Sequence, residues 1–148
     1  MISIESEKGQ AFPSELLEQA ARTVLEYCGV HNADLTLVLA DDVKLHRLNR
    51  DFLGHDYPTD VLAFPANEED PETGQPYLGD VVISLPRAAV QAAEHGHAVE
   101  AEVQLLTIHG ILHLLGHDHA EKDEKERMWK AQTEVLKTLG ISSKIIHE

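Results

Sequence analysis

"VEAEVQLLTIHGILHLLGHDH", residues 99–119, places four of the chain's ten histidines in a stretch that is otherwise mostly apolar. From residue 99 to about residue 115, leucine, isoleucine and valine fall on nearly every side of a helical projection. A helix that is apolar all round is a buried helix. Gly116 is expected to end it. We therefore predict that this segment is the central, buried helix of the fold.

Two histidines of this segment share one face of the predicted helix. His109 and His113 are four residues apart, which places them about 40° apart and one turn above each other on an α-helix. A buried imidazole without a partner is costly. The pair therefore either binds one metal ion together or is a pair of core histidines with other hydrogen-bond partners.

The residues after the pair favour the metal. Gly116 lets the chain turn back, and His119 follows ten residues after His109. This is the spacing of the HExxHxxGxxH zinc site. Three protein nitrogens leave a fourth position open, as in catalytic zinc centres. We predict one Zn²⁺ per chain, with His109, His113 and His119 as ligands and catalytic residues.

The neighbours of His119 leave alternatives open. His117 is either a ligand in place of His119, a base beside the metal or an ordinary loop residue. Asp118 is a candidate for orienting one of the imidazoles through its other ring nitrogen.

Gly110 separates this pattern from the zinc proteases. It follows the first histidine, where those enzymes carry the glutamate that activates water. Glycine cannot accept a proton, so peptide hydrolysis is not expected. We also expect Gly110→Glu to leave the fold intact, because glutamate has the better helix propensity.

Outward from this segment, the chain alternates between helical and strand patterns. Alternating or continuous apolar residues predict strands near residues 35–39, 60–65 and 78–85. Helical spacing and capping residues predict helices over 14–28, 42–52, 86–95, 99–115 and a last helix ending at Gly140. We predict one α+β domain over residues 1–148: a small mixed β-sheet packed with several α-helices, with the metal site on a central helix.

Composition limits the environment and the partners of this domain. Cys28 is the only cysteine, which fits a reducing cytoplasm. The first ten residues have no signal-peptide pattern, and no apolar run predicts a membrane span. Asp and Glu number 26 against 12 Lys and Arg, a net charge of −14. We expect a cytoplasmic protein that does not coat nucleic acid nonspecifically. DNA is not expected among its partners.

Three stretches together resemble one known family. "HGILHLLGHDH" (109–119), "LNRDFLGHDYPTDVLAFP" (48–65) and "LGDVVIS" (78–84) are similar in sequence, order and spacing to the YbeY-type bacterial endoribonucleases, which act in rRNA maturation and ribosome quality control. The resemblance covers about residues 35–140. It implies a single metal-dependent hydrolase domain with His109, His113 and His119 as ligands. Its implied partners are rRNA and ribosomal components.

The chain departs from the family where RNA would be bound. Leu53 occupies the position of an arginine considered important for activity, and basic residues are common where this chain has His55 and Tyr57. The nearest cations in sequence are Arg47 and Arg50. His55 and Tyr57 are either ordinary loop residues or aromatic surfaces on which a base stacks.

Two carboxylates also match family positions. Asp60 and Asp80 are each a candidate for a carboxylate that supports the metal ligands, and Asp60 is equally a candidate for a cap at the start of a strand.

The spacing of the histidines predicts a metal-dependent site, and the family resemblance implies a zinc-dependent endoribonuclease that acts on single-stranded RNA in 3′ end maturation of small-subunit rRNA and in ribosome quality control. The alternatives are a metal-binding ribosome-assembly factor with little intrinsic cleavage and a metal-dependent hydrolase of another substrate. The sequence leaves open the cleavage site, the protein partners and the oligomeric state.

Overall fold

The computed structural model describes residues 1–118 and 120–146, and these residues form a four-stranded sheet with five α-helices and one short 3-10 helix. In chain order the elements are β1 (Ile2–Ser6), α1 (Ser14–Tyr27), β2 (Asp34–Ala40), α2 (Asp42–Leu53), β3 (Val61–Glu69), β4 (Pro76–Ser84), α3 (Leu85–His95), α4 (Val99–Leu114), α5 (Lys122–Thr138) and η1 (Ser143–Ile145). The predicted α+β class is confirmed.

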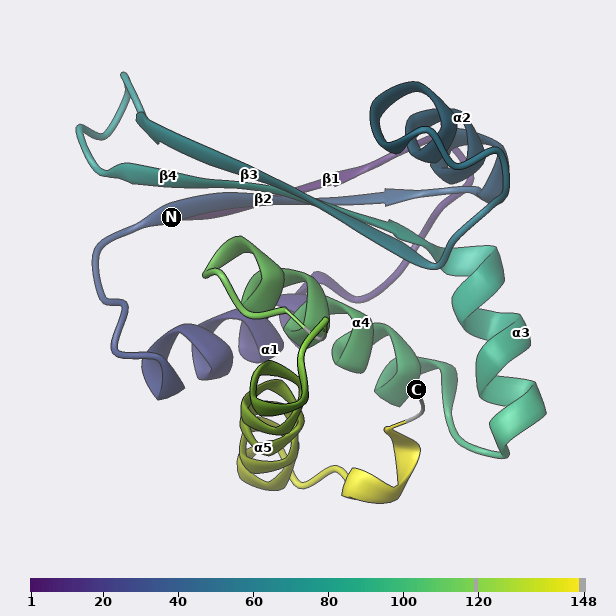
Figure 1. Ribbon diagram of the computed structural model, residues 1–148. Helices are drawn as coiled ribbons and strands as arrows, with labels where there is room; N and C mark the ends of the chain where they lie inside the picture. Colours follow the sequence, from purple (N-terminus) through teal and green to yellow (C-terminus); the bar gives the residue numbers. More distant parts are fainter. Residues whose placement is uncertain (119, 147–148) are drawn as a thin grey trace.

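The sheet is mixed, with strand order β1-β2-β4-β3. β1, β2 and β4 run parallel, whereas β3 pairs antiparallel with β4. The helices α1 and α4 lie on one face, with α5 packed against them on the side away from the sheet, and α2 lies on the other side of the sheet (Figure 1). The larger core lies between the sheet and α1, α4 and α5, and a smaller one of Ala40, Leu45, Leu62 and Val82 lies under α2.

Helix α4 fills the centre of the larger core. It contacts α1, α3, α5, β3 and β4. From residue 102 to residue 114 every residue is buried except His109 and His113, which are half-buried. Even so, neither α4 nor any other helix of the described residues is long and apolar enough to cross a membrane. The apolar surroundings are therefore a protein core, and the two histidines are where this part of the helix reaches the surface.

Gly110 faces the sheet where α4 packs against β4 and β3. A Cβ atom built on it would lie 2.5 Å from Val81 Cγ1 and 3.4 Å from Val61 Cγ2. Distances below about 3 Å force neighbouring atoms to move. The expectation that Gly110→Glu leaves the fold intact is therefore wrong: helix propensity favours glutamate, but the packing of α4 on β4 leaves no room for its side chain.

The sheet contains more than the sequence patterns predict. β1 pairs with β2 from Ile2 opposite Leu35 to Ser6 opposite Leu39, although residues 2–6 were not predicted as a strand. Two alternating isoleucines are too short a pattern to indicate a strand without its partner. β3 and β4 also extend into the acidic segment 67–76, beyond the strands predicted near residues 60–65 and 78–85. The hairpin pairing there, from Glu68 opposite Tyr77, is a tertiary contact that the polar composition does not reveal.

Candidate metal centre

The two histidines of α4 converge on one point. The Nε2 atoms of His109 and His113 are 3.1 Å apart, and the rings meet edge to face at an interplanar angle of 70°. Two nitrogens that each lie 2.0–2.1 Å from one tetrahedral zinc ion are about 3.3 Å apart. The observed separation therefore fits two ligands of one small metal ion, as the spacing in the sequence predicts.

Gln132 of α5 contacts the His109 ring at Nδ1, the nitrogen that does not face His113. Its Oε1 lies 2.8 Å from His109 Nδ1. An amide oxygen only accepts hydrogen bonds, so Nδ1 carries the proton and the Nε2 lone pair of His109 remains available for a metal. This is the usual arrangement behind a metal-binding histidine. Gln132 was not predicted as part of the site, because it lies among the buried, mostly apolar residues of α5. The signal in the sequence was a single amide among those apolar residues.

The third predicted ligand, His119, lies outside the described residues. Within residues 1–118 and 120–146, no group of three or more His, Cys, Asp or Glu side chains is placed to hold a metal ion. The structure thus brings together His109 and His113, and the assignment of His119 stays a prediction.

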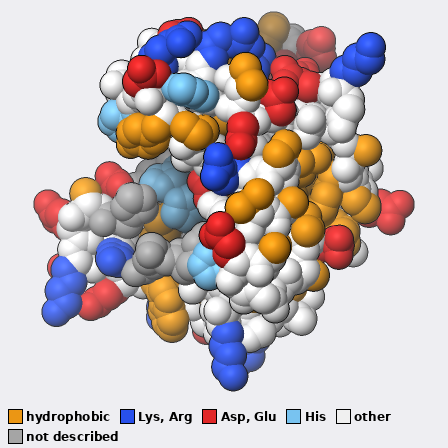
Figure 2. Space-filling view, turned by 90° about the vertical axis from the view of Figure 1, so that its right-hand side faces the viewer, with side chains coloured by type: hydrophobic (Ala, Val, Ile, Leu, Met, Phe, Trp, Pro, Cys, Tyr) orange, Lys and Arg blue, Asp and Glu red, His pale blue; other side chains and the backbone are white. Residues whose placement is uncertain are grey.

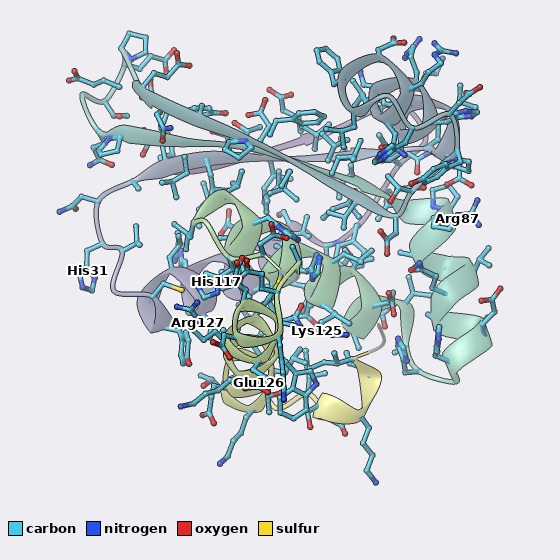
Figure 3. The ribbon with its side chains drawn as sticks, in the orientation of Figure 1. His31, Arg87, His117, Lys125, Glu126 and Arg127 are labelled. Atoms are coloured by element: carbon cyan, nitrogen blue, oxygen red, sulfur yellow. The ribbon has the colours of Figure 1, made fainter. Side chains whose placement is uncertain are left out.

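His117 lines a different cavity. This neighbouring cavity, of about 330 Å³, is formed by the turn after α4 and the start of α5, and Asp118, Glu124 and Arg127 also line it. Burial, and then the positive charge of Arg127, lower the pKa of His117 below its ordinary value. Figure 3 shows His117 and Arg127 on one side of α5 and Lys125 on the other.

The cavity beside the histidine pair is larger, about 400 Å³. It lies between α4, α3, α5 and the start of β3, and we call it the central cavity. The right-hand side of the molecule in Figure 1, seen face-on in Figure 2, is hollowed, and histidine side chains lie in the hollow. The described residues that line the central cavity are Asp60, Val61, Gln91, Leu105, Leu106, His109, Lys125, Met128, Trp129, Gln132 and Ile146.

The two carboxylates that match family positions have different surroundings. Asp60 lines the central cavity and accepts a hydrogen bond from Gln91 Nε2 at 3.1 Å. Asp80, on β4, accepts from the hydroxyl of Tyr77, whose oxygen also lies 2.6 Å from Thr36 Oγ1. Burial, and then the hydrogen bond to Asp80, raise the pKa of Tyr77 to about 12. Asp60 is thus placed at the site, whereas Asp80 belongs to a hydrogen-bond network within the sheet.

The substituted positions in "FLGHDYPTD" lie at the surface. Leu53 ends α2 and is 50 % exposed. The rings of His55 and Tyr57 are parallel, with centroids 5.4 Å apart. Arg50 forms an ion pair with Asp51 at 3.0 Å and is not among the residues that line the central cavity. Among the described residues that line the central cavity, Lys125 of α5 carries the positive charge. It was not predicted from the sequence.

Fold and site together define a small α+β domain with a candidate histidine metal centre beside an open cavity. The model of the family described as Endoribonuclease YbeY matches residues 1–140 of the chain. The chain belongs to this family, which confirms the resemblance seen in its sequence.

Individual relatives agree over nearly the whole chain. The Endoribonuclease YbeY of Halalkalibacterium halodurans is 39% identical over 145 residues, covering 93% of this chain and 90% of the relative. That of Chloroflexus aurantiacus strain J-10-fl is 42% identical, covering 95% and 96%. A solution structure of TM1509 from Thermotoga maritima has a TM-score of 0.62 at 31% identity, covering 95% of this chain and 92% of that chain.

Proposed function

We propose that this protein is a zinc-dependent endoribonuclease that cuts single-stranded RNA, with His109, His113 and His119 as the metal ligands and catalytic residues. The observation that carries the proposal is the 3.1 Å separation of the His109 and His113 Nε2 atoms, with Gln132 behind His109. Membership in a family described as endoribonucleases supports RNA as the substrate.

The residues of the chain have separate tasks in this proposal. His109 and His113 present ring nitrogens to the metal, and Gln132 keeps the proton of His109 on Nδ1. When bound, zinc supplies Lewis-acid chemistry: it polarises a phosphodiester oxygen and lowers the pKa of a water molecule to about 7. Leu105, Leu106 and Met128 give the cavity beside the metal ligands an apolar wall.

The biological setting follows from the family resemblance. We propose that the substrate is the 3′ end of small-subunit rRNA, and that the protein acts with ribosomal components in the cytoplasm in rRNA maturation and ribosome quality control. The whole chain serves as one metal-dependent hydrolase domain.

A metal-binding ribosome-assembly factor with little cleavage is the second candidate. The exposed Leu53 favours it, because this position lacks the family's arginine and the transition state for phosphodiester cleavage needs cations near the phosphate.

The test is RNA cleavage by purified protein whose zinc content has been measured. The substrates are rRNA fragments that combine a duplex with a single-stranded 3′ tail, with single-stranded DNA of the same sequence as a control. We expect cleavage of the RNA tail that scales with zinc occupancy and is lost in His113→Ala. Zinc-loaded protein that binds the RNA without cutting it would favour the assembly factor instead.

A further inference from the structure

One face of α5 forms a wall of the central cavity. Lys125, Met128, Trp129 and Gln132 all line it, and their spacing of three, four and seven residues places them on one side of the helix. Met128 and Gln132 are buried, whereas Trp129 is 48 % exposed. Covering the apolar ring of an exposed tryptophan is energetically favourable. A half-exposed indole that lines a cavity is therefore a surface to which a flat ligand can bind.

The central cavity has two further walls, one apolar and one polar. Leu105 and Leu106 of α4 give an apolar wall. Asp60 and Gln91 give a polar one, in which the Gln91 amide donates to Asp60 and Thr59 Oγ1 lies 3.4 Å from the same carboxylate. With its amide group so oriented, Gln91 Oε1 is buried and has no hydrogen-bond donor within the described residues. The hydrogen bonds from Gln91 and Thr59 fix the orientation of the Asp60 carboxylate on the polar wall.

The positive charge of Lys125 favours binding of an anionic group near Trp129. The chain is strongly acidic, yet the central cavity has Lys125 on its wall, one turn of α5 before Trp129. Figure 3 shows Lys125 on the side of α5 away from Arg127. An ammonium group one helical turn from an aromatic ring matches a ligand that joins a flat heterocycle to a phosphate.

We propose that the central cavity is a nucleotide-binding site in which the base stacks on Trp129 and its phosphate lies near Lys125. The site is adjacent to His109, so a nucleotide bound there lies directly beside the metal centre. The proposal deepens the proposed function, on which it rests for the identity of the polymer. In RNA, the bound nucleotide is the one next to the bond that is cut, and α5 supplies the phosphate contact that Leu53 does not.

Trp129 is the chain's only tryptophan, so its fluorescence reports on this cavity directly. We would titrate the zinc-loaded protein with two probes: a 2′-O-methyl tetranucleotide, which lacks the ribose hydroxyl, and cytidine 5′-monophosphate. Both are expected to quench Trp129, because both carry a base with its phosphate. Tighter binding of the tetranucleotide would assign the site to RNA, and tighter binding of the free nucleotide would contradict that part of the proposal.

Variants separate stacking from folding. Trp129→Ala should weaken binding of a labelled tetranucleotide, measured by fluorescence anisotropy, about tenfold to a hundredfold. Trp129→Phe, which keeps a ring, should retain most of the affinity. The matched control is Tyr27→Ala, since Tyr27 is 46 % exposed at the end of α1 and does not line the cavity. Lys125→Ala should weaken binding and reduce its salt dependence, whereas Lys130→Ala, on another face of α5, should not.

The cleavage assay keeps the two proposals distinguishable. If zinc-loaded protein cuts RNA but neither probe quenches Trp129 and Trp129→Ala leaves KM unchanged, the nucleotide site is wrong and the proposed function stands. If the probes quench Trp129 but no RNA is cut, the nucleotide site stands and the nuclease proposal fails. If neither quenching nor cleavage occurs, both fail.

Discussion

Gln132 Oε1 accepts a hydrogen bond from His109 Nδ1 at 2.8 Å, and this contact joins α5 to the candidate metal centre on α4. It fixes both the orientation of the imidazole and the nitrogen that carries its proton. Partners of this kind usually change metal affinity tenfold to a hundredfold when they are removed.

We therefore expect Gln132→Leu to weaken zinc binding by about 10- to 100-fold, because the leucine leaves Nδ1–H without an acceptor. Competition with a chromophoric chelator measures the affinity. Gln132→Glu, which keeps an acceptor at the same place, is the control and should bind zinc at least as tightly as the unmodified protein. Equal affinities for all three proteins would show that Gln132 has only a packing role.

The zinc ligands can be assigned by metal analysis of single variants. The unmodified protein should carry about one zinc ion per chain, and His109→Ala, His113→Ala and His119→Ala should each lose it. His117→Ala and His31→Ala should keep it, since His117 lines a neighbouring cavity and His31 lies far from the site (Figure 3). Loss of zinc in His117→Ala with retention in His119→Ala would reverse the assignment of the third ligand.

Gly110 sets the spacing between α4 and β4, so a larger residue there should destabilise the protein. Gly110→Ala is expected to lower the free energy of unfolding by about 1–3 kcal/mol, measured by chemical denaturation. Gly110→Glu should be worse, because it also buries a charge. Combining Gly110→Ala with Val81→Ala removes the clashing Cγ atoms and should restore part of the loss. A fully stable Gly110→Ala would contradict this close packing.

Leu53 is 50 % exposed at the end of α2, so an arginine there should be tolerated. We expect Leu53→Arg to keep the melting temperature and to raise the rate of RNA cleavage at equal zinc occupancy, because a guanidinium group makes bidentate contacts with phosphate. Leu53→Lys adds the same charge without the planar guanidinium group, so it tests whether bidentate contact with phosphate matters. A stable Leu53→Arg with unchanged cleavage would indicate that Lys125 already provides the cation.

Tyr77 should make stability depend on pH in the alkaline range. Burial and the hydrogen bond to Asp80 raise its pKa in the folded protein to about 12, whereas the unfolded tyrosine ionises near pH 10. Because the folded pKa is the higher one, the contribution is complete below pH about 10 and is lost as the pH rises toward about 12. The stability advantage of the unmodified protein over Tyr77→Phe should therefore shrink above pH about 10 in denaturation measurements.

The sequence predicted those features that depend on local patterns. The helical spacing of α4 and the pairing of His109 with His113 follow from 3.6 residues per turn alone. What it did not predict depends on contacts between distant segments. β1 is a strand because β2 lies beside it, Gln132 supports His109 because α5 packs on α4, and Gly110 has no room for a side chain because Val81 lies opposite. None of these partners is near in the sequence.

The burial of α4 also sets how the site is lost. His109 and His113 lie on a helix that the apolar core holds in place, so moving their backbone positions apart requires the core to open. The backbone amides around them should exchange with deuterium only through global unfolding, with or without a chelator present. The placement of the two histidine backbones then has the same lifetime as the folded state itself, and metal can come and go without the domain refolding each time.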